Sequence, residues 1–345
     1  MSYANGMAAL NLEMPDIVPR TEYSAEKHWD LIKAVTGITT QDQAASSAFL
    51  KAWDYGMYWN ILMKEQYYGS HYTKMGHANY AYEGSDFDDQ LQCPFEDIDD
   101  VLDFDPSQQY GIPDHKKIVS DFEENYKLMQ KIYPDTVNMT GIYTTCMSGL
   151  IEMFGWDLLL EAAGCEPEKF GAVTNRYADW VMHYFRALAE CSAPVVMVHD
   201  DIVWTDGAFI HPDWYKKYIF PNLKRYFDVL REGGKKIIFT SDGNYTQFID
   251  DIAQCGVNAF VMEPMTDMAA MAEKYGKTHG IIGNVDTRVL LSGTKEEIYG
   301  EVKRCMDIGR DCPGFFLAVG NHIPANTPVE NALYYNECYE KMKKR

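Results

Sequence analysis

The sequence lacks long hydrophobic runs and is poor in positive charge. No apolar stretch approaches the roughly 18 residues that a membrane-spanning helix needs, and residues 1–16 contain neither a basic segment nor a signal-like apolar core. We therefore expect a cytoplasmic protein without a membrane partner. Only 31 Lys and Arg stand against 51 Asp and Glu, which gives a formal net charge of −20. Such a charge repels phosphate backbones, so nucleic acid is not an expected partner.

Two kinds of short motif are also missing. The eight cysteines include no C-x-x-C or C-x-C pair, which argues against a disulfide framework and against a zinc ribbon. No G-x-G-x-x-G or G-x-x-x-x-G-K-[ST] motif follows a strand-like run, which argues against a nucleotide-binding sheet. The 345 residues do contain enough apolar sequence, 46%, for a full hydrophobic core.

Short apolar runs alternate with amphipathic stretches from about residue 190 onward, a pattern typical of consecutive βα units around a parallel sheet. The predicted strands cover 194–199, 236–240, 259–263, 280–283 and 314–320. The helices that follow them are predicted at 212–232, 245–255, 267–275, 295–308 and 328–344. Local signals support two helix starts: Thr294 and Glu297 form a capping-box pattern, and Thr327 before Pro328 reads as an N-cap followed by a first helical residue.

The first half of the chain is less regular but supplies the remaining strands. Residues 140–145, followed by a helix at 156–162, have the pattern of a further unit, and 18–23 and 58–62 are two more strand candidates. A total of eight strands predicts one (β/α)8 (TIM) barrel of the α/β class that spans the whole chain, with an N-terminal helical extension.

Residues 71–106 form a long insertion rich in Tyr, Gly and Asp. Its length exceeds that of a simple connection, and long insertions in barrels usually cover the cleft or carry function. We interpret it as a lid-like segment at the barrel mouth, whose Tyr72 could stack on a flat ligand. A merely decorative surface insertion stays open.

Polar side chains follow five successive predicted strands at the point where each strand ends. Because the carboxyl ends of barrel strands meet at one mouth, where barrel enzymes hold their active sites, we expect these side chains to converge. They include His199, Asp200, Asp201, Ser241, Asp242, Asn244, Glu263, Asn284, Asp286, Asn321 and His322. Carboxylates and imidazoles on one cavity wall shift one another's pKa values or share a cation. The candidate catalytic residues are therefore His199, Asp201, Asp242 and His322.

The same strand ends allow two chemistries. Asp242, Glu263 and His322 could hold zinc through oxygen and nitrogen ligands, although no compact motif such as H-E-x-x-H is present. Alternatively, Asp242 and Glu263 orient a substrate or a catalytic acid without any metal. The candidate substrate-binding residues are Tyr72, Tyr143, Trp204, Asn244, Asn284 and Asn321.

Five segments of the second half, taken in order, resemble a known superfamily. They are PVVMVHDDIVWTDGAFIHPDWYKKYIFPNLKR, IIFTSDGN, VMEPMTDM, IIGNVDTRVLLSGTKEEI and FFLAVGNHIPANTPVENALYY. They resemble the uroporphyrinogen decarboxylase superfamily, especially its corrinoid-dependent methyltransferase branch, over about residues 190–340, with a weaker likeness at NLEMPDIVPRTEYS. The resemblance implies a (β/α)8 barrel whose mouth accepts either a tetrapyrrole substrate or the corrinoid of a separate carrier protein.

Two departures from the family pattern narrow the function that the resemblance implies. The decarboxylase branch carries an arginine-bearing R-Q-A-G-R-like segment that grips propionate carboxylates, whereas PDIVPRTEYS offers only Arg20. Thiol-activating methyltransferases of the superfamily bind zinc through an H-x-C motif and a later Cys, whereas this chain has Thr240-Ser241-Asp242 and Asn321 there. The sequence therefore argues against a polycarboxylate substrate and against a thiol acceptor.

The resemblance then points to a methyltransferase of the substrate-demethylating type. Such an enzyme moves a methyl group from a small methylated donor to the Co(I) corrinoid (cobalamin) of a partner protein. The abundance of Tyr and Met favours a methoxylated aromatic donor, an O-demethylation, while methylamines and betaines stay open. The alternative is a uroporphyrinogen decarboxylase-like lyase, and the sequence leaves a homodimer open.

Overall fold

The computed structural model describes residues 2–62, 71–73, 79–81, 84–86, 92–143 and 145–345 of the chain. The strands are β1 Met57–Tyr58, β2 Asn79–Ala81, β3 Gly84–Asp86, β4 Val137–Asn138, β5 Thr140–Ile142, β6 Val195–His199, β7 Lys236–Ser241, β8 Ala259–Met262, β9 Gly280–Ile282 and β10 Phe315–Phe316. The helices of the first half are α1 Ser2–Leu10, α2 Trp29–Thr36, α3 Gln43–Ala52, α5 Ile98–Asp103, α6 Pro106–Tyr110, α7 His115–Ile132, α8 Met147–Cys165 and α9 Pro167–Glu190. Those of the second half are α10 Pro212–Tyr218, α11 Phe220–Glu232, α12 Ile249–Cys255, α13 Met268–Tyr275, α14 Thr287–Ser292, α15 Lys295–Gly309 and α16 Val329–Met342, and the 3-10 turns are η1 Ala25–Lys27 and η2 Thr246–Phe248.

In the described part of the chain, parallel strands and bridged segments form a barrel of eight members, in which β4 and β5 are consecutive parts of one strand. Six of them make one parallel sheet in the order β10-β9-β8-β7-β6-β5, and β1 pairs in parallel with β4, which leads directly into β5. The segment around Arg20 closes the ring, since it bridges in parallel to Leu317 after β10 and to Tyr55 before β1. Backbone hydrogen bonds follow these bridges: the N–H of Thr21 donates to the Leu317 carbonyl at 3.1 Å, and that of Gly56 donates to the Arg20 carbonyl at 2.8 Å. The predicted (β/α)8 barrel is thereby confirmed.

Side chains along each barrel strand alternate between two hydrophobic cores. In β6, Val195 and Met197 belong to the core inside the barrel, whereas Val196 and Val198 belong to the core between strands and helices. This alternation follows from the two-residue repeat of a β-strand. The interior core draws its strand residues from around the ring: Met57, Trp59, Val137, Met139, Val195, Met197, Ile238, Ala259, Val261, Ile282, Phe316 and Ala318.

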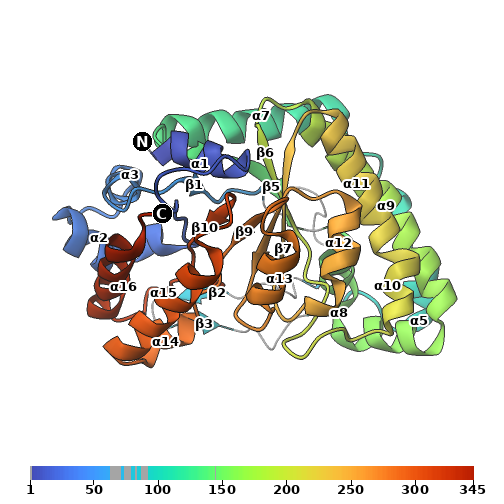
Figure 1. Cartoon of the computed structure of the whole chain (residues 1–345). Coiled ribbons are helices and arrows are strands. Elements are labelled where there is room, and N and C mark those ends of the chain that lie inside the picture. The colour runs from blue at the N-terminus through green and yellow to red at the C-terminus, as the bar shows by residue number, and fades with distance from the viewer. Residues whose placement is uncertain (1, 63–70, 74–78, 82–83, 87–91, 144) are drawn as a thin grey trace.

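Helices cover the outside of the strands (Figure 1). The N-terminal helix α1 adds its buried Ala9 and Leu10 to the interior core, as the expected N-terminal helical extension. Ile17 and Lys344 pair in an antiparallel bridge, so the two ends of the chain lie side by side. In the part of the chain that the structure describes, none of the helices combines the length and the apolar character needed to cross a bilayer.

The structure corrects two predicted helix boundaries. The helix predicted at 212–232 is two helices, α10 and α11, which meet at Ile219 just before Phe220 and Pro221. The helix predicted from Pro328 begins at Val329, and the buried Thr327 hydroxyl makes no capping bond. The capping box of Thr294 with Glu297 is present at the start of α15.

Much of the insertion at 71–106 lies outside the described residues, namely 74–78, 82–83 and 87–91, so its lid-like role stays a prediction. Its described ends pack on helix α8. The N–H of Thr73 donates to the Glu152 carbonyl at 2.8 Å, and the rings of Phe95 and Phe154 meet edge to face with centroids 4.8 Å apart. Tyr72 is buried in the outer core and lines neither of the cavities described below.

Candidate functional site

The strand alternation carries polar side chains onto the inner wall at the barrel mouth. His199 stands two residues beyond Met197, and Thr240 and Asp242 stand two and four residues beyond Ile238. The same spacing places Glu263 beyond Val261 and Tyr143 two positions after Gly141. The apolar core of the barrel therefore gives way, at its carboxyl end, to a ring of titratable groups.

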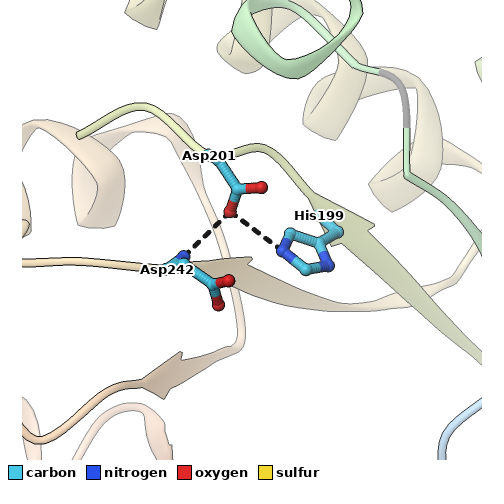
Figure 2. Close-up of side chains that lie close together, drawn as sticks. All are labelled: His199, Asp201 and Asp242. Atoms are coloured by element: carbon cyan, nitrogen blue, oxygen red, sulfur yellow. Dashed lines mark hydrogen bonds and ion pairs between the residues drawn. The ribbon is translucent and has the colours of Figure 1, made fainter. Parts of the chain in front are cut away.

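His199, Asp201 and Asp242 form a hydrogen-bonded cluster at the ends of β6 and β7 (Figure 2). The Asp201 Oδ1 atom lies 3.0 Å from His199 Nε2 and accepts the backbone N–H of Asp242 at 2.9 Å. The Tyr143 hydroxyl donates to Asp201 Oδ2 at 2.8 Å, and its ring packs on the His199 ring with centroids 4.1 Å apart. Both oxygens of Asp201 are thus engaged, and the imidazole is fixed in place.

The electrostatics of this cluster make His199 and Asp201 an ion pair. Burial would raise the pKa of Asp201, but the positive charge of His199 and several hydrogen bonds lower it to about 2. Burial opposes the charged form of His199 as well, yet Asp201 outweighs it and raises the pKa of His199 above its ordinary value. An opposite charge in hydrogen-bond contact favours both ionised forms.

Asp242 has the opposite environment. Burial, reinforced by the negative charges of Asp201 and Glu263, raises the pKa of Asp242 to about 8. Its neighbours Glu263 and Asn321 are linked to it: Asn321 Nδ2 lies 2.8 Å from Glu263 Oε1 and 3.5 Å from Asp242 Oδ2. Glu263 is anchored further, because its Oε2 accepts the backbone N–H of Gly243 at 2.6 Å. At neutral pH the carboxyl of Asp242 is therefore protonated and can donate a proton.

His322 stands apart from this cluster in chemistry. Its Nδ1 atom lies 2.6 Å from the Ser24 hydroxyl, and its ring meets Tyr23 edge to face with centroids 4.8 Å apart. Burial and the nearby charge of His199 lower the pKa of His322 to about 3. This imidazole is neutral at physiological pH and is a poor proton donor there.

Two cavities open at the mouth. The inner cavity, about 660 Å³, lies inside the end of the barrel and is lined by residues such as Tyr23, Trp59, Tyr143, His199, Thr240 and His322. The outer cavity, about 450 Å³, is lined by Trp156, Asp201, Val203, Trp204, Thr205, Asp206, Gly243 and Glu263. Asp242 lines both cavities.

The six predicted substrate-binding residues divide into two groups. Tyr143 and Asn321 line the inner cavity, and Trp204 lines the outer one. Asn244 Oδ1 instead accepts the backbone N–H of Thr246 at 3.1 Å, just before the η2 turn. Asn284 Nδ2 donates to the carbonyls of Glu263 and Thr266. Its Oδ1 accepts a hydrogen bond from Arg304, so the amide links the loop after β8 to helix α15. Together with the buried Tyr72, these two asparagines line neither cavity.

The proposed zinc ligands can be compared with the geometry. Among the described residues, one group of His, Cys, Asp or Glu has ligand atoms all within 4.8 Å of one another, and it consists of His199, Asp201 and Asp242. It shares only Asp242 with the predicted set, which also contained Glu263 and His322. An imidazole and two carboxylates suit a divalent cation that accepts nitrogen and oxygen ligands. Such a cation would act as a Lewis acid on an oxygen in either cavity, and zinc stays a prediction.

Sequence reasoning missed several residues of the inner cavity. Thr240 and Trp59 follow from the two-residue alternation, because they continue the inward faces of Ile238 and Met57. Tyr23 and Glu26, which come after the first barrel strand, carry no such local signal. Their positions become visible only when that strand closes the ring.

Comparison with known proteins agrees with this architecture. The family model of uroporphyrinogen decarboxylase (URO-D) matches residues 80–342. Among curated relatives, the uroporphyrinogen decarboxylase of Syntrophotalea carbinolica is 27% identical over 176 residues, 51% of this chain and 50% of that protein. That of Carboxydothermus hydrogenoformans is 28% identical over 51% of this chain and 49% of that protein. The matches thus span about half the length of these relatives.

A solved structure extends the likeness to the whole fold. The methyltransferase from Methanosarcina mazei superposes with a TM-score of 0.62 at 16% identity, covering 99% of this chain and 98% of that one. At this identity the likeness concerns the barrel alone. Because the family model covers well over half of the sequence, the chain belongs to the uroporphyrinogen decarboxylase family.

Proposed function

We propose that this protein is a corrinoid-dependent methyltransferase of the substrate-demethylating type. Its donor is a methoxylated aromatic, and its acceptor is the corrinoid of a separate protein. The observation that carries the proposal is the position of Asp242, which lines both cavities. Burial raises the pKa of its carboxyl to about 8. Two reactants can therefore meet beside a proton donor.

Cleavage of a methyl ether requires help for the departing oxygen, because an alkoxide or phenoxide leaves poorly without a proton. A docked Co(I) corrinoid would supply the nucleophile for the methyl carbon. As the carbon–oxygen bond breaks, its electron pair stays on oxygen, and Asp242 transfers its proton there to give the free hydroxyl compound. Asp242 then needs to regain one proton before the next turnover. Burial and the negative charges of Asp201 and Glu263 outweigh the opposing positive charge of His199 and so keep Asp242 protonated.

The inner cavity suits the methyl donor. Its volume of about 660 Å³ lies within the range of small-molecule sites. Tyr23 and Trp59 stand 5.6 Å apart between ring centroids with planes 33° apart, and Tyr143 lines the same space. Flat aromatic walls of this kind favour a flat aromatic ligand through offset and edge contacts.

The outer cavity suits the corrinoid partner. Trp204 is 47% exposed there, and its ring contacts those of Trp156 and Phe209 at centroid distances of 5.3 and 5.2 Å. An exposed tryptophan held by aromatic neighbours is a common anchor at protein interfaces. The flat face of a corrin ring can pack on such an aromatic surface.

The alternative reaction, decarboxylation of a porphyrinogen, is supported by the names of the curated relatives. The site offers few positive charges to bind the carboxylates of such a substrate. Among the described residues, Lys27 is the one Lys or Arg that lines either cavity. Arg20 is fully buried instead, paired with Glu22 at 2.9 Å and stacked on Trp53 at 4.3 Å, so it cannot grip a substrate carboxylate.

A turnover assay tests the proposal. Purified protein, a panel of methoxylated aromatics and a reduced corrinoid, free or on its carrier, should give one free hydroxyl compound for each corrinoid methylated. Asp242→Asn should abolish this, while Asp251→Asn on α12, outside both cavities, should not. Carbon dioxide release from uroporphyrinogen without any corrinoid, with no methyl transfer across the panel, would establish the lyase instead.

A further inference from the structure

Among the described residues that line the inner cavity, three have a buried side-chain atom without a hydrogen-bond partner: Glu26 at Oε2, His199 at Nδ1 and Thr240 at Oγ1. The last two stand on neighbouring barrel strands. His199 is 7% exposed and Thr240 is 6% exposed, and both residues line the inner cavity. Leaving a buried donor or acceptor unpaired costs free energy, so such groups usually have a partner in the working state of a protein.

The two side chains are neighbours on one face of the sheet. His199 of β6 and Thr240 of β7 are register partners, and adjacent strands lie about 4.8 Å apart. Both belong to the inward-facing series of their strands, which begins with Val195 and Ile238. The two unpartnered atoms therefore belong to adjacent side chains on the same part of the cavity wall.

The imidazole of His199 is already oriented for this contact. Its Nε2 atom is committed to Asp201 at 3.0 Å, and Tyr143 packs on its ring. Figure 2 shows the second ring nitrogen on the side of the ring away from Asp201. The free edge of the ring is thus the one opposite the ion pair.

We propose that this pair binds an oxygen substituent of the methyl donor, a hydroxyl or a carboxylate, between His199 Nδ1 and Thr240 Oγ1. The inference rests on the proposed function and adds the substrate class to it: the donor carries a polar oxygen besides its methoxyl group. A hydroxyl or a carboxylate oxygen accepts a hydrogen bond from the Thr240 hydroxyl. It also bonds Nδ1, as an acceptor when that nitrogen carries a proton and, for a hydroxyl, as a donor when it does not.

Binding measurements test this without any turnover. Calorimetry would compare methoxybenzene with the isomeric methoxyphenols and methoxybenzoates, each with wild type, Thr240→Val and Thr240→Ser. We expect wild type to bind at least one oxygen-bearing isomer about tenfold more tightly than methoxybenzene. Thr240→Val should remove most of that preference, because it weakens binding of the oxygen-bearing isomer far more than binding of methoxybenzene, and Thr240→Ser, which keeps the hydroxyl, should restore it.

Three results would overturn the inference: no preference in wild type, a preference that survives Thr240→Val, or an equal loss for every ligand in that variant. The last would mean that Thr240 maintains the shape of the cavity and does not recognise an oxygen substituent. Thermal melting of each variant checks that the barrel is intact. Selective binding without corrinoid methylation would uphold the site and remove the proposed function, while methylation without selectivity would do the reverse.

Discussion

At the scale of single residues, two neighbouring aspartates acquire opposite proton affinities. Asp201 shares an ion pair with His199 and its pKa falls to about 2, whereas burial and the charge of Asp201 raise the pKa of Asp242 to about 8. Carboxyl groups whose pKa values are pushed apart in this way typically take different roles in one reaction. Here one residue holds a fixed negative charge and the other holds a transferable proton.

Asp242→Asn should lower the turnover rate by about 10²- to 10⁴-fold, because general acid catalysis contributes that much and an amide has no acidic proton. The affinity for the methyl donor should change little. Wild-type kcat/KM should be flat through neutral pH and fall above about pH 8, where Asp242 loses its proton. A pH–rate profile for both proteins checks this, and a descending limb that persists unchanged in the variant would assign the proton to another group.

The metal prediction also belongs to this scale. Since the ligand atoms of His199, Asp201 and Asp242 lie within 4.8 Å of one another, any zinc bound at the mouth should be lost in His199→Ala and kept in His322→Ala. Elemental analysis of the dialysed proteins measures this directly. The opposite pattern would restore the set that includes His322.

At the scale of elements, helix α8 holds the loop that follows β6. The carboxylate of Asp200 accepts the backbone N–H groups of Cys146, Met147 and Ser148 at 3.2, 2.8 and 2.8 Å, and the N–H of Asp201 donates to the Ser148 hydroxyl at 2.6 Å. A carboxylate at a helix N-terminus satisfies donors that the helix cannot. The helix thereby fixes the backbone from which Asp201 projects.

Asp200→Ala should destabilise the fold by about 3 kcal/mol, because it leaves several buried N–H groups unpaired. A matched comparison is Asp267→Ala, which removes an exposed cap of α13 with a single bond from Ala270. The loss of unfolding free energy in denaturant should be clearly larger for Asp200. Equal losses would mean that the α8 cap is an ordinary one.

Sequence reasoning succeeded where signals are local. The strands predicted from 236 and 259 begin at Lys236 and Ala259, because a buried run and its flanking turn are visible in one short window. The first half of α8 was missed, since Met147–Gly155 is buried on all sides and has no polar face to show a helical repeat. The cap of this helix by Asp200 joins residues more than fifty positions apart and leaves no local trace.

At the scale of the whole molecule, a buried ion pair fastens the barrel where its first and last strands meet. Arg20 pairs with Glu22 and stacks on Trp53, while Glu22 accepts the N–H of Val319 at 2.9 Å and the Tyr335 hydroxyl at 2.6 Å. These contacts tie the strand near the N-terminus to the last strand and to α16. The arginine that the sequence offered for substrate binding is therefore part of the closure.

Glu22→Ala should cost about 3–5 kcal/mol of stability, the usual penalty for leaving one partner of a buried ion pair alone. Equilibrium unfolding in urea measures it. Asp121→Ala, which breaks the exposed pair with Lys117 on α7, should leave the midpoint almost unchanged. A small loss of stability in Glu22→Ala would show that side-chain packing alone stabilises the contact between the first and last strands.

The convergence of the site was predictable in outline only. The rule that strand ends meet at one mouth brought His199, Asp201 and Asp242 together correctly. The rule did not predict the hydrogen bonds of Asn284 with Arg304 and of His322 with Ser24, because those contacts depend on loops and on partners far away in the chain.

The position of Asp242 between two chambers has a kinetic consequence. Because Asp242 is the one lining residue that the inner and outer cavities share, the proposed function gives the two reactants separate binding places. Arrival in either order is then permitted, and initial-velocity plots should intersect, not run parallel. The Michaelis constant of one reactant should stay nearly constant as the other approaches saturation.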